Sequence, residues 1–114
     1  MSIAREQLKT KIQSAYQKRL KDWHDMTVDE LIKGCEEVYI TEKLSRLLPA
    51  CASEEDAAYL IRFVDPLSVV VDAWVASNGL DAMIGDDQLD HLLWRLRDTG
   101  SAEADYALEP AADI

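Results

Sequence analysis

Residues 65 to 79 constrain the fold of this chain more than any other stretch. The pair Asp65-Pro66 predicts a helix start, because aspartate is a good N-cap and proline suits the first helical position. Leu67 to Val75 are apolar on nearly every side, which in a helix means burial on most faces. Three valines at 69–71 also fit a strand, but the Asp-Pro start and the Asn78-Gly79 stop favour a helix. We therefore expect a central helix surrounded by others.

Two helices are expected before this central one. From residue 3 to 23, apolar side chains recur at steps of three and four, the period of one helix face: Leu8, Ile12, Ala15, Tyr16, Leu20 and Trp23. The segment Thr27–Glu30 matches the S/T-x-x-E capping box and opens a second helix. This helix, or a short successor capped by Thr41, continues to about residue 48, because Pro49 disfavours helix at the residue before it. Its inward face is expected to hold Val28, Leu31, Ile32, Cys35, Val38 and Tyr39.

Two more helix starts complete the pattern. Ser53, followed by three acidic residues, predicts a short helix from about 54 to 63. After a short turn over 80–85, Asp86-Asp87 opens a last helix that ends at Thr99-Gly100, and its inward face holds Leu89, Leu92, Leu93 and Leu96. The predicted fold class is all-α, a compact bundle of five or six short helices.

The helical pattern covers residues 1–100, which we expect to form a single domain. Residues 101–114 contain four acidic residues and no basic one. This composition predicts an acidic, flexible tail.

Charge is distributed unevenly along the chain. Residues 1–22 hold six basic and two acidic side chains, whereas residues 23–114 hold six basic and twenty acidic ones, for a net charge of −10. No Lys or Arg occurs between Arg62 and Arg95. Such a surface repels nucleic acid and attracts basic surfaces, so direct nucleic-acid binding is not expected.

No residue pattern carries a chemical reaction. The residues His24, His91, Cys35 and Cys51 could form a Cys₂His₂ set, but zinc ligands come in close pairs and these do not. Asp87 and His91 lie four residues apart on one helix face, yet no nucleophile accompanies them, and Cys35 is expected to be a small buried hydrophobe. We therefore expect no enzyme activity, no metal and no cofactor.

The sequence favours a cytoplasmic location. Its two cysteines lack the dense spacing of a secreted disulfide scaffold, which favours a reducing compartment. The N-terminal residues are mostly polar, and the longest apolar stretch is too short to span a bilayer. No membrane contact is expected.

A resemblance to a known family rests on three stretches: EEVYITEKLSRLL (36–48), EDAAYLIRFVDPLSVVVDAWVASNG (55–79) and DDQLDHLL (86–93). They are similar to a family of small acidic helical domains of unknown function from mobile elements of anaerobic bacteria. The resemblance implies a mobile-element or phage setting and carries no activity or functional residue. In size and charge the chain is also similar to anti-CRISPR and other anti-defence proteins.

Two functions remain open. The first is a protein-binding inhibitor that docks a carboxylate surface on the basic nucleic-acid groove of an effector, with binding that weakens as salt rises. Its expected contact residues are Asp65, Asp72, Asp81, Asp86, Asp87, Asp90 and Trp94. Trp94 lies beside the leucine stripe of the last helix and could be half exposed, but packing in the core is the favoured role for it. The second is a non-enzymatic structural or adaptor domain, homodimeric through the first or last helix, whose acidity serves solubility.

Overall fold

The computed structural model describes residues 3–79 and 85–109, and these form six α-helices and one 3₁₀ turn. The elements are α1 (Ile3–His24), α2 (Val28–Lys33), α3 (Cys35–Cys51), α4 (Glu54–Leu60), α5 (Pro66–Asn78), α6 (Asp86–Thr99) and η1 (Ser101–Ala104). The described residues contain no strand beyond a single isolated bridge. The predicted all-α class is confirmed, whereas most of the turn expected over 80–85 lies outside the described residues.

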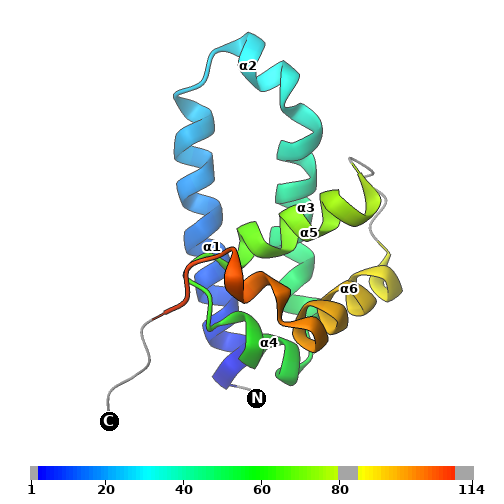
Figure 1. The fold of residues 1–114 in the computed structure, drawn as a ribbon. Helices are drawn as coiled ribbons and strands as arrows, with labels where there is room; N and C mark the ends of the chain where they lie inside the picture. The colour runs from blue at the N-terminus through cyan, green and yellow to red at the C-terminus, as the bar shows by residue number, and fades with distance from the viewer. Residues whose placement is uncertain (1–2, 80–84, 110–114) are drawn as a thin grey trace.

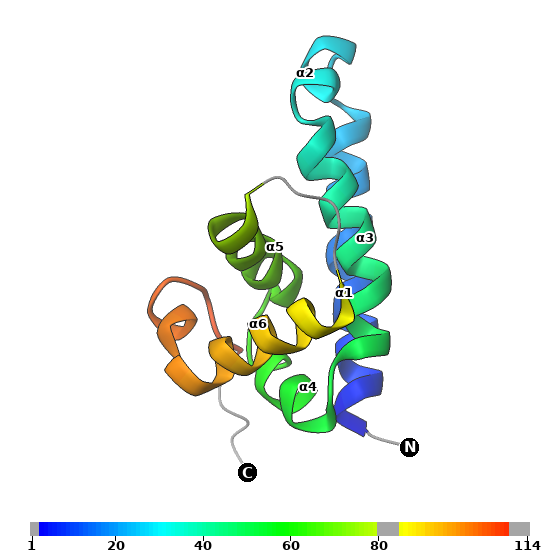
Figure 2. The same cartoon turned by 90° about the vertical axis from the view of Figure 1, so that its right-hand side faces the viewer.

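Helices α1 and α3 form a long antiparallel hairpin with α2 at its tip (Figure 1). Helices α4, α5 and α6 lie on one side of this hairpin, with α5 level with its middle and α4 nearest its base (Figure 2). Helix α5 packs against both arms of the hairpin, and α6 packs against α4 and α5. The hairpin tip therefore extends beyond the other helices. The longest dimension of the molecule is 47 Å.

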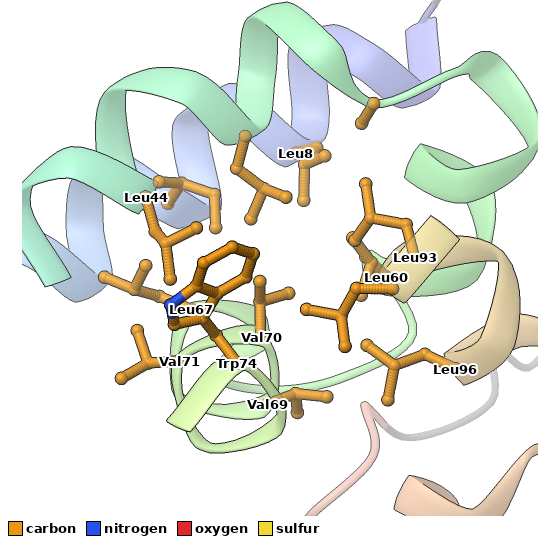
Figure 3. Close-up of a cluster of buried hydrophobic side chains, with 14 of the residues drawn as sticks. Leu8, Leu44, Leu60, Leu67, Val69, Val70, Val71, Trp74, Leu93 and Leu96 are labelled. Carbon is orange, nitrogen blue, oxygen red and sulfur yellow. The ribbon is translucent and has the colours of Figure 1, made fainter. Parts of the chain in front are cut away.

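Helix α5 is the centre of the core, as its apolar sequence predicts. Its side chains Leu67, Val69, Val70, Val71 and Trp74 are all at most 1% exposed. Figure 3 shows these side chains between Leu8 and Leu44 of the hairpin on one side and Leu60, Leu93 and Leu96 of α4 and α6 on the other. Burial of this kind supplies the main favourable free energy of folding.

Local capping determines where the helices begin and end. Thr27 and Glu30 exchange both hydrogen bonds of the capping box that opens α2. Ser53 caps α4 together with Asp56, and Asp65 accepts the backbone N–H of Ser68 at the start of α5. Helices α5 and α6 end at glycines with positive φ, which glycine adopts at little steric cost: Gly79 and Gly100. These predicted boundaries are confirmed.

Two predictions about the second helix are wrong. The helix does not end at residue 48. Helix α3 includes Pro49 and ends at Cys51. A proline forfeits only one backbone hydrogen bond, and here it does so in the last turn, where the N–H of Ala52 still reaches the carbonyl of Leu48. In addition, Gly34 separates α2 from α3.

The expected inward face of this second helix is not buried. Val28, Ile32 and Tyr39 are 72%, 63% and 52% exposed, and Cys35 is exposed as well. The physical reason is the fold: α4, α5 and α6 cover only the base and middle of the hairpin, so nothing in the described chain lies over this face. Cys35 is therefore not the small buried hydrophobe that the sequence suggested.

Residues 101–109 pack on the body, although their composition predicts a flexible tail. Ala102 is buried in the core, and the N–H groups of Val64 and Glu109 donate to the carbonyls of Ala107 and Arg62 at 3.0 and 2.7 Å. Two ion pairs add to this contact: Lys11 with Glu109 and Arg62 with Glu103. The folded domain therefore continues past residue 100 at least to 109.

Candidate functional site

The outward face of α6 brings together part of the expected contact surface. Leu89, Leu92, Leu93 and Leu96 turn into the core, so the residues between them face solvent. Asp87, Asp90 and Trp94 are exposed there, and Asp98 follows one turn later. We call these four residues the α6 face. Asp86 is the first residue of the same helix.

Both arginines of α6 are held by neighbouring helices. Arg97 donates from Nε to Oδ1 of Asp56 and from Nη1 to Glu55 on α4, each at 3.1 Å. Arg95 donates from Nη2 to the Ser77 hydroxyl of α5 at 3.0 Å. Arg97 is therefore paired with two carboxylates of α4, whereas Arg95 is directed toward α5. No ion pair found among the described residues engages Asp87, Asp90 or Asp98.

Trp94 gives the α6 face an apolar centre. It is 48% exposed, so it is half exposed and not packed in the core, the role that the sequence favoured. The ring stacks on His91, with centroids 5.9 Å apart and planes at 22°. A tryptophan held in this way loses little further freedom on binding, so it is suited to anchor a partner.

The remaining expected contact residues lie elsewhere. Asp72 on α5 accepts a hydrogen bond of 2.6 Å from the hydroxyl of Tyr106. Burial together with this bond raises the pKa of Tyr106 to about 12. Asp65 caps α5 through both of its carboxylate oxygens. Asp81 lies outside the described residues. The structure thus brings Asp87, Asp90 and Trp94 together and assigns Asp65 and Asp72 to the internal bonding of the fold.

Sequence reasoning missed Asp98 as a member of the α6 face. The signal was available, because residue 98 follows Trp94 by four positions and Asp87 by eleven, which places all three on one side of a helix.

The residues weighed as metal ligands are dispersed. Cys35 and Cys51 are the two ends of α3, which at 1.5 Å per residue places them about 24 Å apart. Among residues 3–79 and 85–109, no three His, Cys, Asp or Glu side chains are grouped to hold a metal ion.

The same part of the chain contains no helix that combines the length and the apolar character needed to cross a membrane.

A second surface feature was not expected from the sequence. A groove of about 610 Å³ runs between the lower halves of α1 and α3, and its lining includes Lys9, Gln13 and Tyr16 on one arm and Glu42 and Arg46 on the other. Arg46 donates to Glu42 at 2.6 Å, and this hydrogen bond raises the pKa of the guanidinium. Partial burial, with a smaller contribution from Glu42, raises the pKa of Tyr16.

A scan against models of known protein families gives no match, and searches of curated proteins and of solved structures likewise find no similar chain. The resemblance of residues 36–93 to a mobile-element family therefore stays a prediction from the sequence.

Proposed function

We propose that this protein is an acidic protein-binding module that acts as an inhibitor of the anti-CRISPR or anti-defence type. It docks the α6 face on the basic groove in which a partner protein binds nucleic acid. The observation that carries the proposal is that Asp87, Asp90 and Asp98 surround an exposed Trp94 and that no ion pair found among the described residues engages them, because Arg97 pairs with α4 and Arg95 bonds to Ser77 of α5.

Such a face suits a basic groove for two physical reasons. Carboxylates on a rigid helix attract cationic side chains and accelerate association with them, as the phosphates of a nucleic acid do. The aromatic side chain of Trp94 at the centre of the face adds apolar contact area, which carboxylates alone would not supply. Residues 63–94 contain no Lys or Arg, and of the two arginines that follow on α6, Arg97 is paired with the carboxylates of α4.

A capture experiment tests the proposal. The immobilised chain is exposed to host extract treated with nuclease, at ionic strengths of about 0.1 M and about 1 M, where the Debye length falls from about 10 Å to about 3 Å. We expect a nucleic-acid-binding protein to be retained at the lower ionic strength only. The double variant D87K/D90K should retain clearly less of it.

The matched control is D22K/D25K, which changes the net charge by the same amount at exposed positions at the end of α1. This control should retain the partner as the wild type does. Equal loss in both variants would mean that net charge alone governs capture, and retention by D87K/D90K equal to that of the wild type would exclude the α6 face.

The proposal includes a cytoplasmic location, which is supported by two free cysteines at opposite ends of one helix. The alternative function, a structural or adaptor domain, is favoured by one observation only. That observation is the uncovered face of the α1–α3 hairpin.

A further inference from the structure

Among the residues that the structure describes, nothing covers one face of the α1–α3 hairpin. Helices α4, α5 and α6 pack on the opposite side (Figure 2). The side chains that meet them are Leu8 and Ile12 on α1 and Ile40, Leu44 and Leu48 on α3. The groove described above lies between other residues of the same two helices, so it marks the uncovered side.

On α1 the groove residues continue as a regular stripe toward the tip. The positions are Lys9, Gln13, Tyr16, Leu20 and Trp23, at steps of four and three. The lower members are polar and the upper three are aromatic or aliphatic. Tyr16 and Trp23 form an edge-to-face pair with ring centroids 5.9 Å apart.

A matching stripe runs along α2 and α3. It consists of Val28, Ile32, Cys35, Tyr39, Glu42 and Arg46, again at steps of four and three. The steps continue across Gly34, because its N–H bonds to Glu30 and its carbonyl accepts the N–H of Val38. We call the two stripes together the hairpin face. A seven-residue repeat of this kind is the pattern by which helices pack side by side in bundles.

The upper half of the hairpin has no core of its own. From Tyr16 to Tyr39, all 24 residues are described and none has a buried side chain. Short helices without tertiary packing are marginal in water, and ordering each residue costs conformational entropy. Apolar side chains that are regularly spaced, exposed and carried on such helices indicate that another layer covers them.

The charges of the two arms indicate what that layer is. Helix α1 holds six basic and two acidic residues, whereas α2 and α3 together hold five acidic and three basic ones. A second copy, related by a two-fold axis parallel to the hairpin, places each α1 against the α2–α3 arm of its partner. Arms of opposite net charge then meet in both contacts.

We infer that the hairpin face binds the hairpin face of a second copy of this chain, so that two hairpins form an antiparallel four-helix bundle. The acidic parts of the two chains, formed by α4, α5 and α6, then lie on opposite outer sides of the bundle. Their mutual electrostatic repulsion is least in this arrangement. The dimer displays two α6 faces, but its formation does not depend on the proposed function of that face.

Sedimentation equilibrium of the full chain tests this inference. The wild type should reach twice the 12.8 kDa mass of one chain as concentration rises. The variant I32K should remain at the single-chain mass, because it removes an apolar contact and adds a cation opposite the basic α1 of the partner. Its fold should be unchanged, since the Ile32 side chain is 63% exposed in the single chain. The matched control V64K changes a side chain that is 51% exposed on the body, and it should dimerise as the wild type does.

Two further readouts separate this dimer from other outcomes. Alkylation of Cys35 should slow as wild-type concentration rises and should not slow in I32K. The dimer should persist at about 1 M salt, where screening would abolish binding through the α6 face. The inference would be overturned if the wild type stayed at the single-chain mass at all concentrations. This includes the case in which the hairpin face binds a different protein. A dimer unaffected by I32K would overturn it as well.

Discussion

The substitution Ala102→Asp distinguishes a packed C-terminal segment from a mobile tail. Ala102 is 6% exposed and lies among Val69, Leu96 and Tyr106, so an aspartate there would be a carboxylate without a partner in the core. A buried charge without a partner costs about 3–5 kcal/mol of folding free energy. The chain can avoid that cost by releasing residues 101–109, so the penalty is limited by the contacts of this segment.

Those contacts set the expected magnitude. Release breaks two backbone hydrogen bonds to residues 62–64 and the hydrogen bond from Tyr106 to Asp72. At about 0.5–1.5 kcal/mol each, these three bonds amount to roughly 1.5–4.5 kcal/mol. The two exposed ion pairs add little, and the freed backbone regains entropy. We expect A102D to lower the free energy of unfolding by about 2–4 kcal/mol.

Urea unfolding followed by circular dichroism measures this difference. The matched control is A104D, which places the same charge at an exposed position of the same 3₁₀ turn and should change stability by less than about 0.5 kcal/mol. If A102D and A104D unfold at the same urea concentration, residues 101–109 do not pack as described.

Two other predictions concern side chains that join elements. Arg97→Ala should lower the free energy of unfolding by about 1–3 kcal/mol, because the side chain of Asp56 is 8% exposed and loses its charged partner, whereas Arg95→Ala should cost under about 0.5 kcal/mol. Tyr106→Phe should reduce the alkaline sensitivity of folding. The folded-state pKa of about 12 lies above the ordinary 10.0, so the stability from this tyrosine is complete below pH 10 and is lost as pH rises toward 12. A stability–pH curve unchanged by the substitution would contradict this assignment.

The helix boundaries could be predicted because capping is local. Asp65-Pro66 and Gly79 act within one turn of the residues they cap, and the same holds for the box formed by Thr27 and Glu30. The central position of α5 could also be predicted, since a helix that is apolar on most sides must be covered. The predicted end at residue 48 was wrong because the effect of a proline depends on its place in the helix. Pro49 lies in the last turn of α3, where it destabilises the helix little.

Long-range contacts could not be predicted from the sequence. The stripe of Val28, Ile32 and Tyr39 indicates an apolar face, but periodicity does not specify which element covers it. None of the described elements of the chain does. Likewise the composition of residues 101–109 is acidic and polar, while their packing depends on pairing with 62–64, about 45 residues earlier in the chain.

The candidate site was predicted only in part, for a related reason. The exposure of Trp94 follows from the leucine spacing of α6. The hydrogen bond that holds Asp72 depends on Tyr106, thirty-four residues later, and no local pattern reveals it.

Competition with nucleic acid on the captured partner tests the central claim most directly. Labelled nucleic acid bound to that partner is titrated with the wild type, D87K/D90K and D22K/D25K. We predict that the wild type and D22K/D25K displace it with the same midpoint, and that D87K/D90K needs about tenfold more protein, equivalent to about 1.4 kcal/mol. Simultaneous binding of the protein and nucleic acid, or equal displacement by D87K/D90K, would contradict the assignment of the α6 face to a nucleic-acid groove.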